Sequence, residues 1–232
     1  HQSKEGIQYQ VTPTFNETSI GDKTLSRDII PYCRSRNIEV TLNRMKPRTK
    51  FYTFFDNIDV TQWCTPKLLE ITMNSGVFQV GEKCHATADG GKTYFDFRLA
   101  APNHKEGPYN SPTKVLTLNP YDNAAGVPSV YSTSSTMLNV DTASLSNQPE
   151  GDYFGNAVEG MQILGLTSGA DATCKELRLI TDTLGNLKFC FNIPDPNVTA
   201  NPQFETGTKT LKMTTSPTNS SVAGTVSGSA EA

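Results

Sequence analysis

The chain has 232 residues and a formal net charge of −3, from 20 Lys and Arg against 23 Asp and Glu. This balance gives no global field to attract nucleic acid or an acidic membrane, and no stretch approaches the ~18 consecutive apolar residues of a membrane span. Hydrophobic residues make up 36% of the chain, and they include eleven Phe and eight Tyr, so we expect folded cores in two compact modules.

The ends and the cysteines predict the setting of the protein. The sequence begins without a Met and without an apolar signal region, and it ends in the Ser/Gly/Ala-rich stretch "SSVAGTVSGSAEA". We therefore expect a piece of a longer protein with a flexible tail over 216–232. Five scattered cysteines without a C-x-x-C pair predict free thiols made in a reducing cytosol.

The first part of the chain predicts an arm and then a strand. Residues 1–28 show little periodicity, and "PTFNETSIGDKTLS" reads as an extended arm or as a strand added to a neighbour. In "RSRNIEVTLN", apolar and polar residues then alternate with a period of two. Because this period is typical of a half-buried strand, we expect Ile38, Val40 and Leu42 to face a core.

Further strands follow to about residue 128. "KFYTFFDN" carries aromatics on both faces, as a central strand would. "DGG" at 89–91 predicts a hairpin whose second strand directs Phe95, Phe97 and Leu99 to one side. "TKVLTLNPY" predicts one more strand, and only "PKLLEITMN" suggests a helix, weakened by its Ile and Thr.

A second set of strands is predicted over 129–215, after a polar, turn-rich crossing that holds one strand at 136–140. Its segments are "GMQILG", "ADATCKELRLITD", "LKFCFNIPDP" and "FETGTKTLKMTT". The predicted organisation is an arm (1–28), a β-sandwich domain (29–128), a second β-rich domain (129–215) and the tail. The predicted fold class is all-β, with an immunoglobulin/fibronectin-like sandwich followed by a smaller β-rich domain.

"MKPRTKFYTFFDNIDVTQW", at 45–63, packs aromatics behind a run of cations. Met45, Pro47, Thr49, Phe51 and Tyr52 resemble the corner of fibronectin-like sandwiches, where an aromatic anchors the turn between sheets. This favours a structural role over a ligand platform. The nearby cations predict a solvated rim, with polyanion binding as the alternative; they are Arg34, Arg36, Arg44, Lys46, Arg48 and Lys50.

No pattern in the sequence selects catalytic, cofactor or metal residues. "GLTSGA" around Ser168 lacks the strand-to-helix context of a nucleophile elbow, and it reads better as a tight turn. Adjacent Cys84 and His85 would point to opposite faces of a strand, which disfavours a zinc site. For a hydrolase, the acid pairs that can be named are Asp56 with Asp59 and Asp182 with Asp195, but their spacing does not select them.

Several blocks, taken in order, resemble the very large structural proteins of tailed bacteriophages, with those of marine and cyanobacterial phages most alike. They include "RSRNIEVTLNRMKPRTKFYTFFDNIDVT", "FRLAAPNHKEGPYNSPT", "YSTSSTMLNVDTASL" and "GMQILGLTSGADATCKELRLITDTLGNL". The resemblance runs from about Ile29 to the C-terminus. It departs from the family at Cys64, Cys84, Cys174 and Cys190, where apolar or small residues are expected.

The resemblance implies a place in a particle more firmly than an activity. We expect a non-enzymatic virion protein of the tail, baseplate or fibre region, assembled in the host cytoplasm. Its expected partners are other virion proteins and copies of itself, with no nucleic acid, membrane, metal or cofactor. The alternatives are a tail-associated hydrolase and a receptor- or carbohydrate-binding module, which needs exposed aromatics such as Trp63 or Tyr109.

Overall fold

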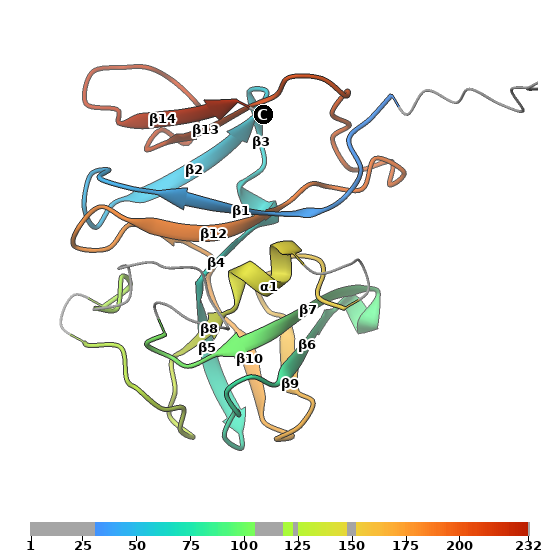
Figure 1. Ribbon diagram of the computed structural model, residues 1–232, viewed down its shortest axis with the longest axis vertical. Helices are drawn as coiled ribbons and strands as arrows, with labels where there is room; N and C mark the ends of the chain where they lie inside the picture. The colour runs from blue at the N-terminus through green and yellow to red at the C-terminus, as the bar shows by residue number, and fades with distance from the viewer. Residues whose placement is uncertain (1–30, 105–117, 123–124, 148–151, 232) are drawn as a thin grey trace, which may run out of the picture. The chain divides into compact units, whose positions relative to one another are not determined.

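The computed structural model of the chain describes residues 31–104, 118–122, 125–147 and 152–231 (Figure 1). They all belong to the second of the chain's two units, His1–Ile30 and Pro31–Ala232. The predicted arm, Tyr109 and most of the strand predicted in "TKVLTLNPY" lie outside these ranges. The described protein is mostly β, which confirms the all-β class. Its α-helix is short, α1 (Thr142–Asn147), and no helix of the described ranges has the length and apolar character to cross a membrane.

Two sheets face each other in one part of the fold. The three-stranded sheet has the order β1-β12-β4, with strands Asn37–Leu42, Leu187–Asn192 and Cys64–Pro66. The five-stranded sheet has the order β11-β2-β13-β14, with β3 also paired to β2. Its strands are Leu179–Ile180, Lys50–Phe55, Thr210–Thr214, Ser227–Glu231 and Ile58–Asp59. Phe55 and Phe191 meet edge to face between the sheets, with centroids 5.4 Å apart.

The other part is a closed six-stranded barrel with the order β10-β5-β8-β7-β6-β9. In this order its strands are Asp171–Cys174, Leu68–Ser75, Met137–Val140, Thr93–Ala100, Lys83–Ala88 and Gln162–Gly165. Phe95, Phe97 and Leu99 of β7 are fully buried in its core, as their alternation predicted. Short 3₁₀ turns cover Thr61–Trp63 and Asp89–Gly91, and the second joins the predicted hairpin β6–β7.

Strand pairing crosses the predicted domain boundary at residues 128 and 129 in every sheet. β1 and β4 pair with β12, β2 pairs with β11 and β13, and β7 pairs with β8. The barrel, β5 to β10, therefore lies in the chain between β4 and β11, and the facing sheets are built from segments on either side of it (Figure 1). Local alternation identifies strands but says little about which strands pair, so the barrel was not predicted.

Three local predictions were wrong. "PKLLEITMN" forms strand β5, not a helix, because Leu68, Leu69 and Ile71 are buried in or beside the barrel. The predicted flexible tail contains β14, which pairs with β13. The helix α1 lies in the predicted crossing and packs on β1 and β12, which explains why β12 is buried on both faces instead of alternating.

The corner at residues 45–51 is fixed by the turn between β11 and β12. The Met45 N–H donates to the Gly185 carbonyl at 2.9 Å, and the Thr181 hydroxyl donates to the Lys46 carbonyl at 2.7 Å. Phe51, which follows, is fully buried in the core between the facing sheets. The aromatic run thus has the structural role that its pattern favoured.

Candidate assembly interface

The three-stranded sheet ends at β1, whose outer edge faces no strand of the described residues. β1 pairs with β12 along its full length, from Asn37 opposite Asn192 to Leu42 opposite Leu187. An edge strand of this kind presents a row of backbone N–H and C=O groups directed away from its partner. Such an edge can accept an additional strand from another polypeptide.

A groove of about 580 Å³ lies along this edge, and both sheets contribute to its walls. Ile38 and Val40 come from β1, Phe55 from β2 and Leu211 from β13. Ile38, Val40 and Leu211 are only partly buried and pack against the core between the facing sheets. Because these side chains are only partly buried, apolar surface between the two sheets reaches solvent along this edge.

Charged groups surround the groove, and two of them are tied into ion pairs. Lys209 Nζ lies 2.6 Å from Asp56 Oδ2, and its hydrogen bond lowers the pKa of the Asp56 carboxyl. Glu39 Oε1 accepts a hydrogen bond from Lys188 Nζ at 2.7 Å. Arg34 lines the groove just before the start of β1. The rim is therefore polar and the floor apolar, which is the usual anatomy of a protein interface.

The predicted basic cluster is divided by the length of β1. Arg34 and Arg36 precede the strand and line the groove, whereas Arg44 follows it and lines a separate shallow hollow with Leu184. The six residues of β1 separate the two groups by about 20 Å. The cations therefore do not converge on one polyanion, and the pair at the groove is the part that belongs to the candidate interface.

Three of the four acids considered for a hydrolase hold local turns, and the fourth, Asp56, joins two segments that are distant in the chain. Asp56 accepts the Thr210 N–H, and the other three accept N–H groups two to four residues ahead of them. The contacts are Asp59 with Thr61, Asp182 with Leu184 and Asn186, and Asp195 with Asn197, all at 2.8 to 2.9 Å. These hydrogen bonds explain Asp59, Asp182 and Asp195 as turn residues, which is a common structural use of Asp.

Ser168 and His85 are both held by carboxylates on the barrel. Ser168 Oγ donates to Glu82 Oε1 at 2.8 Å, and Glu82 also accepts the N–H groups of Thr167 and Ser168. This confirms the predicted tight turn, which joins β9 to β10. His85 Nδ1 lies 2.5 Å from Asp96 Oδ1.

Buried sulfur and scattered acids do not assemble a metal site in the part of the chain that is described. Cys84 is fully buried in the barrel core, and the next residue, His85, is partly exposed, as adjacent strand positions predict. No group of three or more His, Cys, Asp or Glu side chains of these residues is arranged to hold a metal ion. All five cysteines are free, and burial raises the pKa of Cys64 to about 12.

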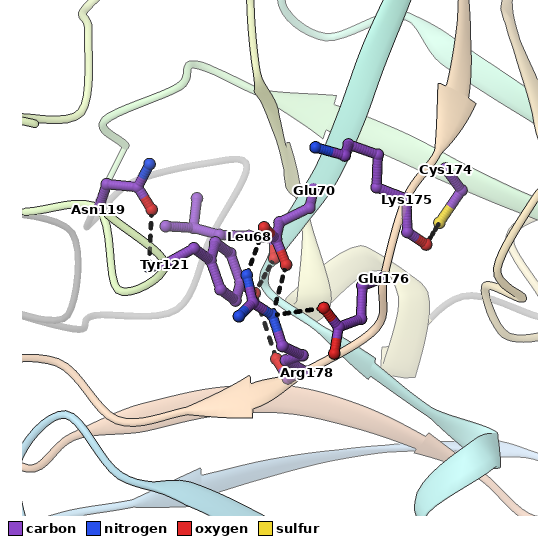
Figure 2. A network of polar contacts seen from close by, with 8 residues as sticks. All are labelled: Leu68, Glu70, Asn119, Tyr121, Cys174, Lys175, Glu176 and Arg178. Carbon is purple, nitrogen blue, oxygen red and sulfur yellow. Dashed lines mark hydrogen bonds and ion pairs between the residues drawn. The ribbon is translucent and has the colours of Figure 1, made fainter. Parts of the chain in front are cut away.

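A polar network joins the barrel to the segment that leaves it (Figure 2). Arg178, which precedes β11, forms a bidentate ion pair with Glu70 of β5 at 2.9 and 2.7 Å and lies 3.4 Å from Glu176. Its guanidinium sits 5.1 Å from the centre of the Tyr121 ring. The Tyr121 hydroxyl donates to the Leu68 carbonyl at 2.5 Å. The network therefore links the start of β5, where the chain enters the barrel, to the segment after β10, where the chain leaves it.

Of the two aromatics predicted for glycan binding, the structure describes one, Trp63, and its side chain is not among the exposed ones. Trp63 is partly buried and packs against the core between the facing sheets, and Tyr109 lies outside the described ranges. Tyr94 on β7 is 48% exposed and stacks on His85 with centroids 6.3 Å apart. Its alternation with buried Phe95 and Phe97 predicted that Tyr94 faces outward, but Tyr94 was not among the aromatics named for glycan binding.

Lys67, between β4 and β5, is the least expected buried group. Its side chain is 1% exposed, and its Nζ has no hydrogen-bond partner among the residues that the structure describes. Burial lowers the pKa of this amine to about 7; the charge of Lys188 adds to the shift, and Asp141 opposes it. Asp141 caps α1 through the Ser144 N–H, and burial raises the pKa of its carboxyl.

Comparisons with family models, with curated proteins and with solved structures find no match for this chain.

Proposed function

We propose that this chain is a structural module of a phage virion, in the tail, baseplate or fibre region, that acts by protein–protein assembly and not by catalysis. In this proposal it assembles in the host cytoplasm and holds other virion proteins, and copies of itself, in register. We further propose that its two facing sheets belong to the immunoglobulin/fibronectin-like class of sandwiches.

One observation carries the assembly role: the outer edge of β1, which faces no strand of the described ranges, lies beside an apolar groove of about 580 Å³. An apolar groove rimmed by charges fits a polypeptide segment better than a small polar substrate. The structural hydrogen bonds made by Asp56, Asp59, Asp182 and Asp195 support a non-enzymatic role. The virion setting is supported by the resemblance of the ordered sequence blocks.

The direct test of the virion setting is electron microscopy of source particles labelled with antibody raised against this chain. We expect label at the tail tip, baseplate or fibres. Label confined to the head would contradict the tail assignment, and particles without any label would contradict the virion assignment. Antibody absorbed with the purified protein is the control for specific labelling.

A second candidate function, recognition of host surface glycan, is favoured by the exposure of Tyr94. An exposed ring held by a neighbouring side chain can stack on the apolar face of a sugar. If this holds, binding to a glycan array should saturate and be lost in Tyr94→Ala. Leu166→Ala removes a side chain of similar exposure from the same barrel and should bind as the parent does. A flat response across glycans would exclude this function.

A further inference from the structure

The groove beside β1 extends from the surface to the core between the facing sheets. Its lining includes Phe55, Phe191 and Ile193, which are at most 7% exposed. Its volume of about 580 Å³ lies within the range of small-molecule sites, roughly 300–1,000 Å³. Most of the lining is apolar, so water in the groove makes few hydrogen bonds with the protein and is readily displaced by an apolar ligand.

The face of β1 that lines the groove changes from cationic to apolar along its length. Arg36, Ile38 and Val40 occupy alternate positions and therefore lie on one face of the extended chain. Arg36 precedes β1, but the Ile193 N–H donates to its carbonyl at 2.9 Å, so the pairing with the β12 segment includes it. Arg34, two residues earlier, also lines the groove. This wall is therefore basic at one end and apolar along the rest.

The two arginines are available to an anion. Both are exposed, and within the described ranges neither guanidinium forms a hydrogen bond or an ion pair with another side chain. Glu39 and Glu231 line the groove as well, but Glu39 accepts a hydrogen bond from Lys188, and Glu231 comes from β14 in the other sheet. Because the net charge of the whole chain is −3, attraction of an anion to this end is a local effect of Arg34 and Arg36.

We propose that the groove binds a free long-chain carboxylate, with its aliphatic chain along Ile38, Val40 and Leu211 and its carboxylate beside Arg34 and Arg36. A guanidinium binds a carboxylate through two parallel hydrogen bonds, and the chain displaces water from apolar surface. A small inorganic anion would leave the apolar lining uncovered, and a neutral hydrocarbon would leave the arginines without a partner. The inference goes beyond the proposed assembly role, because this ligand binds the isolated chain.

Isothermal titration calorimetry of the full chain with laurate, below the concentration at which laurate forms micelles, is the first test. Dodecyltrimethylammonium carries a cationic head on a chain of the same length, and butyrate carries the carboxylate on a short chain. Laurate should bind more tightly than either probe by roughly tenfold or more. Equal binding of the cationic probe would show that the head is not recognised. Equal binding of butyrate would show that the chain is not, and either result would overturn the proposal.

Charge variants test the position of the head. Replacement of both arginines, Arg34→Gln with Arg36→Gln, should weaken laurate binding by roughly fivefold to tenfold. Arg44→Gln is the matched control, because Arg44 follows β1 and lines a separate hollow; it should stay within about twofold of the parent. Glu231→Gln removes an acid from the groove and should strengthen binding by about twofold. Equal losses in the double variant and in Arg44→Gln would overturn the assigned position of the head.

Apolar variants test the position of the chain. Val40→Asp places a charge on the apolar wall and should weaken laurate binding by roughly tenfold or more. Leu211→Ala shortens a half-buried side chain on the opposite wall, so it is the milder variant and should weaken binding by about threefold or more. Val222→Asp changes a Val that is 65% exposed and does not line the groove, and it should bind as the parent does. Thermal unfolding checks that each variant is folded. Unchanged binding in both groove variants would overturn the proposal.

Vesicles of phosphatidylcholine and phosphatidylglycerol distinguish a free chain from a membrane as the source of the ligand. Laurate should bind in buffer without vesicles. A protein that associates with these vesicles but does not bind laurate would overturn the proposal. None of these results bears on antibody labelling of particles, which tests the proposed function separately.

Discussion

At the residue scale, the side chain of Lys67 is buried, so its charged form is poorly solvated in the folded protein. Moving an ammonium group from water into the protein interior costs free energy. Repulsion from the charge of Lys188 makes the charged form of Lys67 less favourable still. Since Lys67 Nζ has no hydrogen-bond partner among the described residues, the amine gains little in return. Folding therefore favours the neutral amine near physiological pH.

Lys67→Met should remove a pH dependence of stability. The pKa of this amine falls from its ordinary value of 10.5 to about 7 on folding, so between these values the unfolded chain binds a proton that the folded chain does not. The free energy of unfolding of the parent should therefore rise with pH across this window, by up to about 1.4 kcal/mol per pH unit relative to Lys67→Met. Urea unfolding from pH 6.5 to 10 measures it.

Lys92, an exposed cation in the hairpin between β6 and β7, supplies the control. Lys92→Met should follow the parent at every pH. If the difference between the parent and Lys67→Met is constant across the range, the amine stays charged in the folded protein and the reasoning fails.

The position of Lys67 could not be predicted from its neighbours. In "CTPKLLE" it reads as an ordinary surface cation. It is buried because segments that are distant in the chain pack around it. Its N–H donates to the Lys188 carbonyl, and its own carbonyl accepts the Val140 N–H. By contrast, Phe95 and Phe97 were assigned to a core correctly, since alternation along one strand is enough to identify them.

At the scale of elements, the turn between β11 and β12 depends on one glycine. Gly185 has φ of +74°, and a Cβ added there would lie 1.9 Å from the Met45 carbonyl oxygen. The close approach exists because the Met45 N–H donates to the Gly185 carbonyl, which holds the 45–51 corner against this turn. A side chain would have to displace backbone, which has little freedom to move.

Gly185→Ala should lower the free energy of unfolding by about 3 kcal/mol or more, from the unfavourable φ and the displaced corner together. Gly169→Ala is the matched control, because its φ of +70° is similar but no atom lies within 4 Å of the added Cβ. It should cost only about 1 kcal/mol. Equal costs, measured by urea unfolding, would show that the contact with Met45 can relax.

The element boundaries illustrate what periodicity can and cannot predict. The strands near 38–42, 137–140 and 187–192 were predicted because apolar residues mark them locally. The helical reading of β5 was wrong because consecutive Leu68 and Leu69 fit either a helix or a strand buried on both faces. The edge of β1 was not foreseen, since a strand's place in a sheet depends on partners about 150 residues away.

At the scale of the molecule, two connecting segments join the barrel to the facing sheets, one before β5 and one after β10. One ion pair holds the two ends of the barrel together. Arg178 belongs to the exit segment, and Glu70 belongs to the first barrel strand. Glu70→Gln keeps the shape of the side chain but removes its charge, so it should lower the free energy of unfolding by about 1–3 kcal/mol. Denaturant unfolding monitored by Trp63 fluorescence measures the effect.

Glu176→Gln makes the same chemical change at the more distant partner. Glu176 is 54% exposed and 3.4 Å from Arg178, and exposed ion pairs contribute little, so its effect should fall below about 0.5 kcal/mol. An effect of Glu176→Gln as large as that of Glu70→Gln would show that Arg178 is held by the total charge around it and not by the bidentate contact.

The insertion of the barrel also sets how the protein would carry tension. β1 at the start of the described chain and β14 at its end both belong to the facing sheets, so a pull between them loads those sheets first. The barrel is attached through the connecting segments before β5 and after β10, and it lies outside this path of force. Force would reach the barrel only after these sheets unfold. It would then act where β5 and β10 lie side by side, because the Lys175 N–H donates to the Glu70 carbonyl there and Arg178 forms its ion pair with the Glu70 side chain. The ion pair between Arg178 and Glu70 (Figure 2) is thus the first barrel contact that would resist separation of these strands, and the barrel would be the last part of the chain to extend.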